Sequence, residues 1–125
     1  MKRITHTALG AGTACMALGI VFEAYAAHAL HNDLFYIFEV GVKSQVYHGL
    51  GLILLGILCA VLPYNKSFRW STLLIITGVI LFSGSLYLMA LTDAKIPKLI
   101  TPLGGLSLTA GWLIFTLGTL KKPRA

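Results

Sequence analysis

The sequence predicts an all-α integral membrane protein, a single domain in which four transmembrane helices pack as a bundle. Hydrophobic residues make up 57% of its 125 positions, and the mean hydropathy is +0.83. Charged residues amount to only 11%, and they stand almost entirely between long apolar runs. A soluble domain of this size would carry far more polar surface. Composition and charge placement therefore indicate a chain that resides in a bilayer.

Four apolar runs are long enough to cross the membrane, at about 7–27, 45–62, 72–91 and 101–120. A span needs about 20 residues to cross a hydrocarbon layer of about 30 Å. Pro63 ends the second run, and Pro102 is tolerated in the first turn of the fourth. The first run has a competing interpretation as a signal peptide, because Ala24-Tyr25-Ala26 has the form of a cleavage site. Its length and the adjacent Glu23 favour a retained helix.

Residues 28–44 join the first two runs and have a helical pattern of their own. Phe38 and Val42 fall on one apolar face, whereas Glu39 and Lys43 lie off it. This pattern predicts an interfacial amphipathic segment between the first and second spans. No proline separates it from the run that begins at Gln45, so one long bent helix is the alternative.

Basic residues stand at the ends of the apolar runs and not along one face. The N-terminal end, the loop at 63–71 and the C-terminal tail hold seven of the ten Lys and Arg residues. The positive-inside rule therefore predicts both termini in the cytoplasm, in a multi-pass protein of the plasma (inner) membrane. Because the basic residues form no continuous face, the net charge of +6 does not indicate nucleic-acid binding.

Small residues recur seven positions apart in all four runs, which places each set on one helix face. The glycines predicted to pack in this way are Gly12, Gly19, Gly49, Gly56, Gly78, Gly104, Gly111 and Gly118. Small residues let backbones approach closely in lipid, and a seven-residue period favours left-handed crossings. The spacing predicts a close-packed bundle. With the scarcity of soluble loops, it also motivates an expectation of contacts with other membrane subunits or a second copy of the chain.

Polar side chains at membrane depth are expected to gather at the non-cytoplasmic end of the bundle. This predicted polar cluster comprises His28, Gln45, His48, Ser83, Ser85, Tyr87 and Thr101. A polar group in hydrocarbon needs a partner, and an ionisable one marks a candidate functional site. Two interpretations stay open: a hydrogen-bonded layer that sets helix register, or a site for a small ligand or ion.

Two histidines of this cluster could ligate a metal or a b-type haem, since imidazole suits both. No motif spacing around His28 and His48 supports such a site, and a lone buried histidine is more often hydrogen-bonded. No cofactor is therefore predicted, and haem or metal bound through these two residues remains the alternative.

Glu23 raises the possibility of a small transporter, because small four-helix drug/proton antiporters use a glutamate in the first helix. Glu23 lies near the end of its run and not at the bilayer centre, so we expect it to be hydrated or paired with Lys43. The chain has no Ser/His/Asp order, phosphate loop or paired carboxylates, and we therefore do not expect an enzyme.

Several motifs in a fixed order resemble those of a known family. They are Ala27-His28-Ala29-Leu30, Gln45-x-x-His48, the stretch from Leu81 to Tyr87, Thr101-Pro102-Leu103-Gly104-Gly105, and Gly111-Trp112. Over about residues 8–118 the chain resembles the small membrane proteins of domain of unknown function 423, also called UPF0382. The resemblance implies a retained first helix, four spans and a plasma-membrane location, and it implies no activity or catalytic residue. The stretch from Glu23 to Ala27 and the serine at position 44 depart from the family pattern.

The leading hypothesis is a non-enzymatic accessory or interaction subunit of a membrane complex. The second is a small-ligand, quinone, haem or metal site in the outer half of the bundle.

Overall fold

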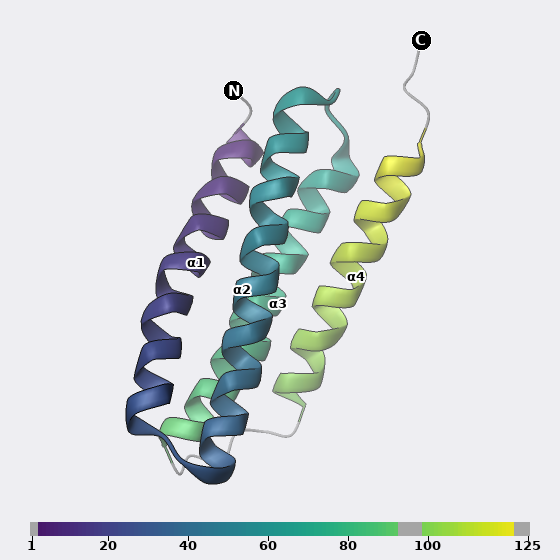
Figure 1. Cartoon of the computed structure of the whole chain (residues 1–125). Helices are drawn as coiled ribbons and strands as arrows, with labels where there is room; N and C mark the ends of the chain where they lie inside the picture. The colour runs from purple at the N-terminus through teal and green to yellow at the C-terminus, as the bar shows by residue number, and fades with distance from the viewer. Residues whose placement is uncertain (1–2, 93–98, 122–125) are drawn as a thin grey trace.

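The computed structural model describes residues 3–92 and 99–121, which form four antiparallel helices (Figure 1). They are α1 (Arg3–Ala29), α2 (Asn32–Val61), α3 (Lys66–Leu91) and α4 (Ile100–Leu120). Each is long and apolar enough to cross a membrane, which confirms the prediction of four long apolar helices. The start of α1 and the end of α4 lie at the same end of the bundle. Some basic residues used to predict orientation lie outside the described residues, namely Lys2, Lys95, Lys98, Lys122 and Arg124.

The second helix answers the question left open for residues 28–44. α2 begins at Asn32 and runs without a break to Val61, so residues 32–44 continue into the second span as one long helix, whereas residues 28–29 still belong to α1. Asn32 has a φ of 58°, a left-handed conformation that asparagine tolerates, and it allows the chain to reverse directly after α1. The third helix also begins earlier than its apolar run, because the side chain of Asn65 caps it by accepting a hydrogen bond from the Ser67 amide at 2.9 Å.

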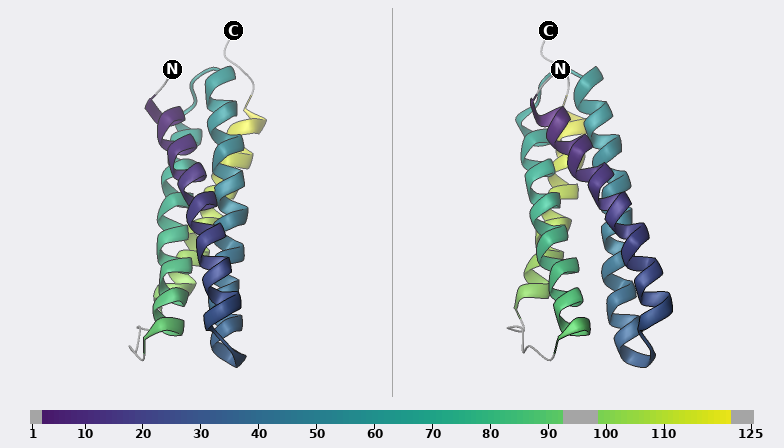
Figure 2. Two further views of the ribbon diagram at one scale, coloured as in Figure 1. Left: turned by 60° about the vertical axis from the view of Figure 1, so that its left-hand side comes forward. Right: turned by 90° about the vertical axis from the view of Figure 1, so that its left-hand side faces the viewer.

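Helices that follow one another in the chain pack against one another. α1 lies on α2, α2 on α3, and α3 on α4, whereas α1 and α3 approach each other only briefly. No close backbone approach joins α4 to α1 or α2 within the described ranges. In the right-hand view of Figure 2, α1 runs obliquely, and its C-terminal end lies away from that of α3. The bundle is therefore tighter at the end that holds the start of α1.

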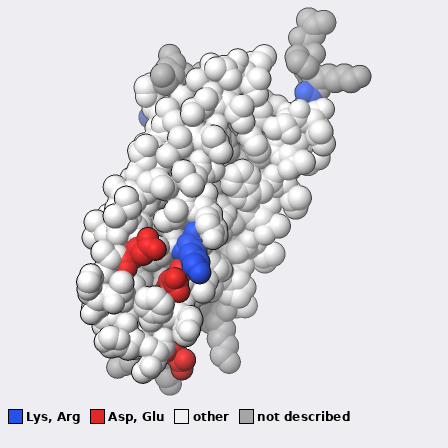
Figure 3. Space-filling view, in the orientation of Figure 1, with Lys and Arg blue, Asp and Glu red and all other residues white. Residues whose placement is uncertain are grey.

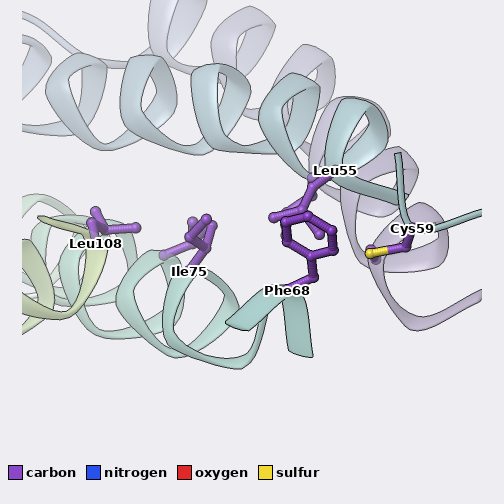
Figure 4. Close-up of a cluster of buried hydrophobic side chains, with 8 residues drawn as sticks. Leu55, Cys59, Phe68, Ile75 and Leu108 are labelled. Atoms are coloured by element: carbon purple, nitrogen blue, oxygen red, sulfur yellow. The ribbon is translucent and has the colours of Figure 1, made fainter. Parts of the chain in front are cut away.

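The main hydrophobic core lies toward that tighter end, between α2 and α3. Leu55 of α2 and Phe68 of α3 point toward each other, and Ile75 and Leu108 extend the cluster toward α4 (Figure 4). Leu55 and Ile75 are fully buried. A second, smaller cluster forms at the opposite end around Phe38 and Val42 of α2.

The outer surface of the helices is largely apolar, as expected for contact with lipid. Figure 3 shows few charged side chains on this face, and the acidic ones gather over the lower parts of α1 and α2. The Lys43 ammonium lies 3.8 Å from the Glu39 carboxylate, one helical turn earlier. The structure thus pairs Lys43 with Glu39 and not with Glu23, and Glu23 is exposed, which fits the hydrated one of its two expected states.

The eight predicted packing glycines all lie where two helices come closest. At each of them, an added Cβ would fall within 3.0 Å of an atom on a neighbouring helix. At Gly104 it would lie 2.5 Å from the Phe82 backbone nitrogen, and at Gly12 2.7 Å from the Gly49 carbonyl oxygen. A Cβ at Gly84 would meet nothing within 4 Å. At Gly12 and Gly104 a side chain would push the helices apart, because it would meet backbone that cannot rotate away, whereas at Gly19 and Gly118 it would meet side chains.

Candidate functional site

Gln45 is the centre of a hydrogen-bonded link between three helices. It lies on α2, only 5% exposed, and its Nε2 donates to the Cys15 carbonyl oxygen of α1 at 2.9 Å. The Tyr87 hydroxyl of α3 donates to its Oε1 at 2.6 Å. One amide side chain thus satisfies a tyrosine hydroxyl and contacts the backbone of another helix. This geometry holds α1, α2 and α3 in one register.

A glycine one turn before Gln45 makes room for this contact. An added Cβ at Gly41 would lie 2.8 Å from the Tyr87 ring, so only glycine lets the ring reach the amide. The Gly41 carbonyl also accepts a hydrogen bond from the Ser83 hydroxyl at 2.7 Å. Gly41 was not among the predicted packing glycines, because it precedes the predicted span and lacks a glycine seven residues away. Its position four residues before a buried glutamine was the available signal.

A separate contact joins α3 to α4. The Ser85 and Thr101 hydroxyls lie 2.6 Å apart. The Ser85 hydroxyl is also within hydrogen-bond distance of the Phe82 carbonyl oxygen, at 2.9 Å. When Ser85 donates its one hydroxyl proton to the carbonyl, Thr101 is the donor between the two hydroxyls. Both hydroxyls are therefore satisfied without water.

His48 lies on α2 and faces α4, apart from the link made by Gln45. Its Nδ1 is 2.7 Å from the Ser44 carbonyl oxygen, which can only accept, so Nδ1 carries the proton. The imidazole and the Trp112 ring have centroids 6.0 Å apart. Trp112 crosses from α4 to α2, and a Cβ at Gly51 would lie 2.6 Å from its indole. The indole thus spans the distance between two helices whose backbones do not approach closely.

His28 does not join the other members of the predicted cluster. It is exposed in the last turn of α1. Gly49 packs against Gly12 and Cys15 of α1, so the neighbouring His48 lies at that level. His28 is about 15 residues further along α1, or about 20 Å at the helical rise. Haem or metal held between these two histidines does not fit this separation, and the described residues contain no group of three or more His, Cys, Asp or Glu that could hold a metal ion.

We had expected polar contacts between helices at one end of the bundle, but they also occur elsewhere along it. The Ser107 hydroxyl donates to the Leu74 carbonyl oxygen at 2.7 Å, nearer the middle of the bundle. The Asn65 amide donates to the Gly118 carbonyl oxygen at 3.1 Å, at the end that holds the start of α1. Such contacts could not be found from the sequence, since their acceptors are backbone groups that every residue carries.

An apolar cavity of about 280 Å³ lies where α1 and α3 diverge. We call it the aromatic cavity, and it is lined by Val21, Phe22, Tyr25, Phe38, Tyr87 and Leu91. The Tyr87 ring centroid is 4.7 Å from that of Phe38 and 5.1 Å from that of Phe22. Its hydroxyl bonds to Gln45, so Tyr87 belongs both to the cavity wall and to the polar link. The sequence placed Tyr87 in the predicted polar cluster but did not indicate the cavity.

Four apolar helices that satisfy buried polar groups from one another define a helical membrane protein with four candidate spans. The profile of a family described as "protein of unknown function (DUF423)" matches residues 22–105. The chain is 40% identical over 114 residues to a UPF0382 membrane protein of Staphylococcus haemolyticus, covering 88% of this chain and 92% of that protein.

Two more distant relatives agree with this match. A UPF0382 membrane protein of Bacillus subtilis, YwdK, is 33% identical over 90% of this chain and 94% of its own length. The UPF0382 inner membrane protein YgdD of Escherichia coli is 32% identical over 84% of this chain and 82% of its own length. No solved structure matches. The chain therefore belongs to the DUF423, or UPF0382, membrane protein family, as its motifs had indicated, and it resides in the inner (plasma) membrane.

Proposed function

We propose that this protein is a non-enzymatic interaction subunit that docks another transmembrane helix on the outward face of α1. The observation that carries the proposal is a second set of small residues on α1. One set, which includes Gly12 and Gly19, is buried against α2. The exposed set consists of Gly10, Thr13, Ala14, Ala17, Ala24 and Ala27. Small outward residues favour close approach of a helix, because lipid gives two helices no hydrophobic reason to associate.

The outward face of α4 differs from that of α1 between Gly10 and Ala17. Further along α1, bulky side chains are also exposed, namely Leu18, Ile20, Val21 and Tyr25. The exposed side chains of α4 are mostly leucines, namely Leu103, Leu106, Leu113, Leu117 and Leu120. Bulky aliphatic side chains interact well with acyl chains, and they keep another helix backbone at a distance. We therefore assign α4 to lipid contact and α1 to contact with a partner.

The orientation belongs to the same proposal. At 1.5 Å per residue, the 30 residues of α2 measure about 45 Å, which exceeds a hydrocarbon layer of about 30 Å. We place the excess, with Asp33 and the Glu39–Lys43 pair, in the non-cytoplasmic interface. The segment expected to be interfacial is then the first part of α2. Arg3, at the opposite end with the start of α1, faces the cytoplasm by the positive-inside rule.

We also propose that the protein has no enzymatic activity. Within the described part of the chain, the hydroxyl and amide groups of the predicted cluster bond to one another or to backbone, whereas His48 bonds through Nδ1 and not through Nε2. Groups satisfied in this way suit a structural layer better than a reaction centre, which needs a free base or nucleophile.

Site-specific photo-cross-linking in intact membranes would test the docking face. A photoreactive amino acid is placed at Ala14 or Ala17 on α1, with Leu106 and Leu113 on α4 as matched controls. We expect a defined protein adduct from the α1 positions only, either a dimer or a product with one other membrane protein. A bulky change at the same face, Gly10→Leu, should reduce its yield. Equal yields from α1 and α4, or a lone monomer in native mass spectrometry, would contradict the proposal.

A further inference from the structure

The aromatic cavity has a buried floor and an exposed rim. Phe38 of α2, only 2% exposed, forms the floor together with the half-buried Phe22 and Tyr87 rings. Tyr25 and Val21 on α1, and Leu91 on α3, are exposed and form the rim. The cavity therefore opens sideways, between two helices whose C-terminal ends lie apart (Figure 2).

Apolar atoms form the inner surface of the cavity, and Tyr25, one of its two tyrosines, stands at the exposed rim. Its one half-buried polar side chain, Tyr87, has its hydroxyl turned into the bundle, where it donates to Gln45 at 2.6 Å. A ligand with a carbonyl or a carboxylate would lose its hydrogen bonds with water and gain none here, which costs free energy. The chemistry of the wall therefore selects a hydrocarbon and disfavours the head of a quinone or the propionates of a haem.

The position of the cavity determines which hydrocarbon lies beside it. Its lining on α1, residues 21–25, lies within the last third of that helix, and Tyr87 and Leu91 lie in the last two turns of α3. In a four-span protein this level is the boundary between the hydrocarbon and the headgroups of one leaflet, on the side of the α1–α2 turn, where Glu23 and the Glu39–Lys43 pair also lie. The molecules that face the rim there are bilayer lipids, whose tails can enter without leaving the membrane.

We propose that the aromatic cavity binds one acyl chain of a phospholipid from this leaflet. The volume of about 280 Å³ lies just below the range of about 300–1,000 Å³ for sites that hold a whole small ligand, so it suits part of a molecule. Ring surfaces facing an empty space lose their dispersion contacts, and an inserted chain restores them. The cavity adjoins the proposed docking face, because Val21 on its rim lies on the same side of α1 as Ala14 and Ala17, and it extends from there toward α3.

Photolabelling with a phospholipid that carries a diazirine on its acyl chain would test this assignment. The full-length protein is reconstituted in vesicles of phosphatidylethanolamine and phosphatidylglycerol that contain a small fraction of the probe. Three tyrosines give a matched comparison, because they share the same chemistry. Tyr25 lines the cavity and is 46% exposed, whereas Tyr36 and Tyr47 lie outside it and are 67% and 66% exposed.

We expect severalfold more label on Tyr25 than on Tyr36 or Tyr47, although Tyr25 is the least exposed of the three. Label that follows exposure instead would overturn the proposal. Val21→Trp and Leu91→Trp fill the cavity from its rim without touching the floor. Either substitution should lower the label on Tyr25 to the level of the other tyrosines, with helix content unchanged by circular dichroism.

A competition experiment identifies the chain. Unlabelled phospholipid should dilute the label on all three tyrosines in proportion, and an isoprenoid alcohol at the same mole fraction should do no more than that. Selective loss of label from Tyr25 with the isoprenoid alcohol would overturn the assignment to an acyl chain. Label on Tyr25 that persists in both tryptophan variants would overturn the assignment to this cavity.

Discussion

The hydrogen bond between Gln45 and Tyr87 should stabilise the bundle measurably, and a double-mutant cycle can isolate its contribution. Tyr87→Phe keeps the ring against Gly41 and removes only the hydroxyl that donates at 2.6 Å. Gln45→Leu keeps a side chain of similar size and removes both bonds of the amide, including the one to the Cys15 carbonyl. The double variant removes the Tyr87 hydroxyl and the Gln45 amide together, so the cycle reports the coupling between these two groups.

The structure gives the expected magnitude of this coupling. Hydrogen bonds between transmembrane helices contribute about 0.6 kcal/mol on average and up to about 1.7 kcal/mol. The Gln45–Tyr87 bond is short, and the amide is 5% exposed, so we expect a coupling of about 1 kcal/mol, or about fivefold in the unfolding equilibrium. Gln45→Leu should cost more than Tyr87→Phe, because it also removes the contact with α1.

Reversible unfolding in mixed micelles with increasing dodecyl sulfate, followed by tryptophan fluorescence, measures these free energies. Gln45→Leu combined with Ser85→Ala serves as a control cycle, because Ser85 bonds to Thr101 and shares no partner with Gln45. The two control changes should add within about 0.5 kcal/mol. A coupling between Gln45 and Tyr87 no larger than in this control would refute the view that the amide links the helices energetically.

Three further changes test the packing by the same unfolding assay. Gly104→Ala should lower the free energy of unfolding by about 1–3 kcal/mol, because its Cβ would meet the Phe82 backbone. Gly84→Ala, the control, should be neutral or slightly stabilising. Similar effects of the two changes would contradict the close approach of α3 and α4. Thr5→Val should stabilise by about 1 kcal/mol, since the buried Thr5 hydroxyl has no partner among the described residues; a loss of stability would indicate a partner. Asn65→Ala should cost about 1 kcal/mol through the lost cap of α3, and an unchanged midpoint would count against that cap.

Helix bounds show where local sequence information is sufficient. α3 ends at Leu91 and α4 at Leu120, the residues at which the apolar runs end. The starts of α2 and α3 lie well before their runs, because polar residues can continue a helix that a cap and a turn have begun. The cap at Asn65 and the left-handed turn at Asn32 supply those starts.

The site residues show the opposite case. Gln45 and Tyr87 stand 42 positions apart, and nothing local to either indicates that they meet. His28 and His48 appeared close when depth alone was considered, yet they differ by about 20 Å along the axis. Membrane depth was therefore too coarse a coordinate for predicting a site.

The sequence by itself determined that this protein is a four-helix protein of the membrane, because hydropathy, length and small-residue spacing are properties of each segment alone. Only the tertiary structure decided which polar groups pair and where a cavity opens. Each residue rotates the side-chain direction by about 100°, so a shift of one residue between antiparallel helices replaces every contact on the shared face. That register depends on packing at points such as Gly41 beneath Tyr87, where the shapes of two helices fit each other.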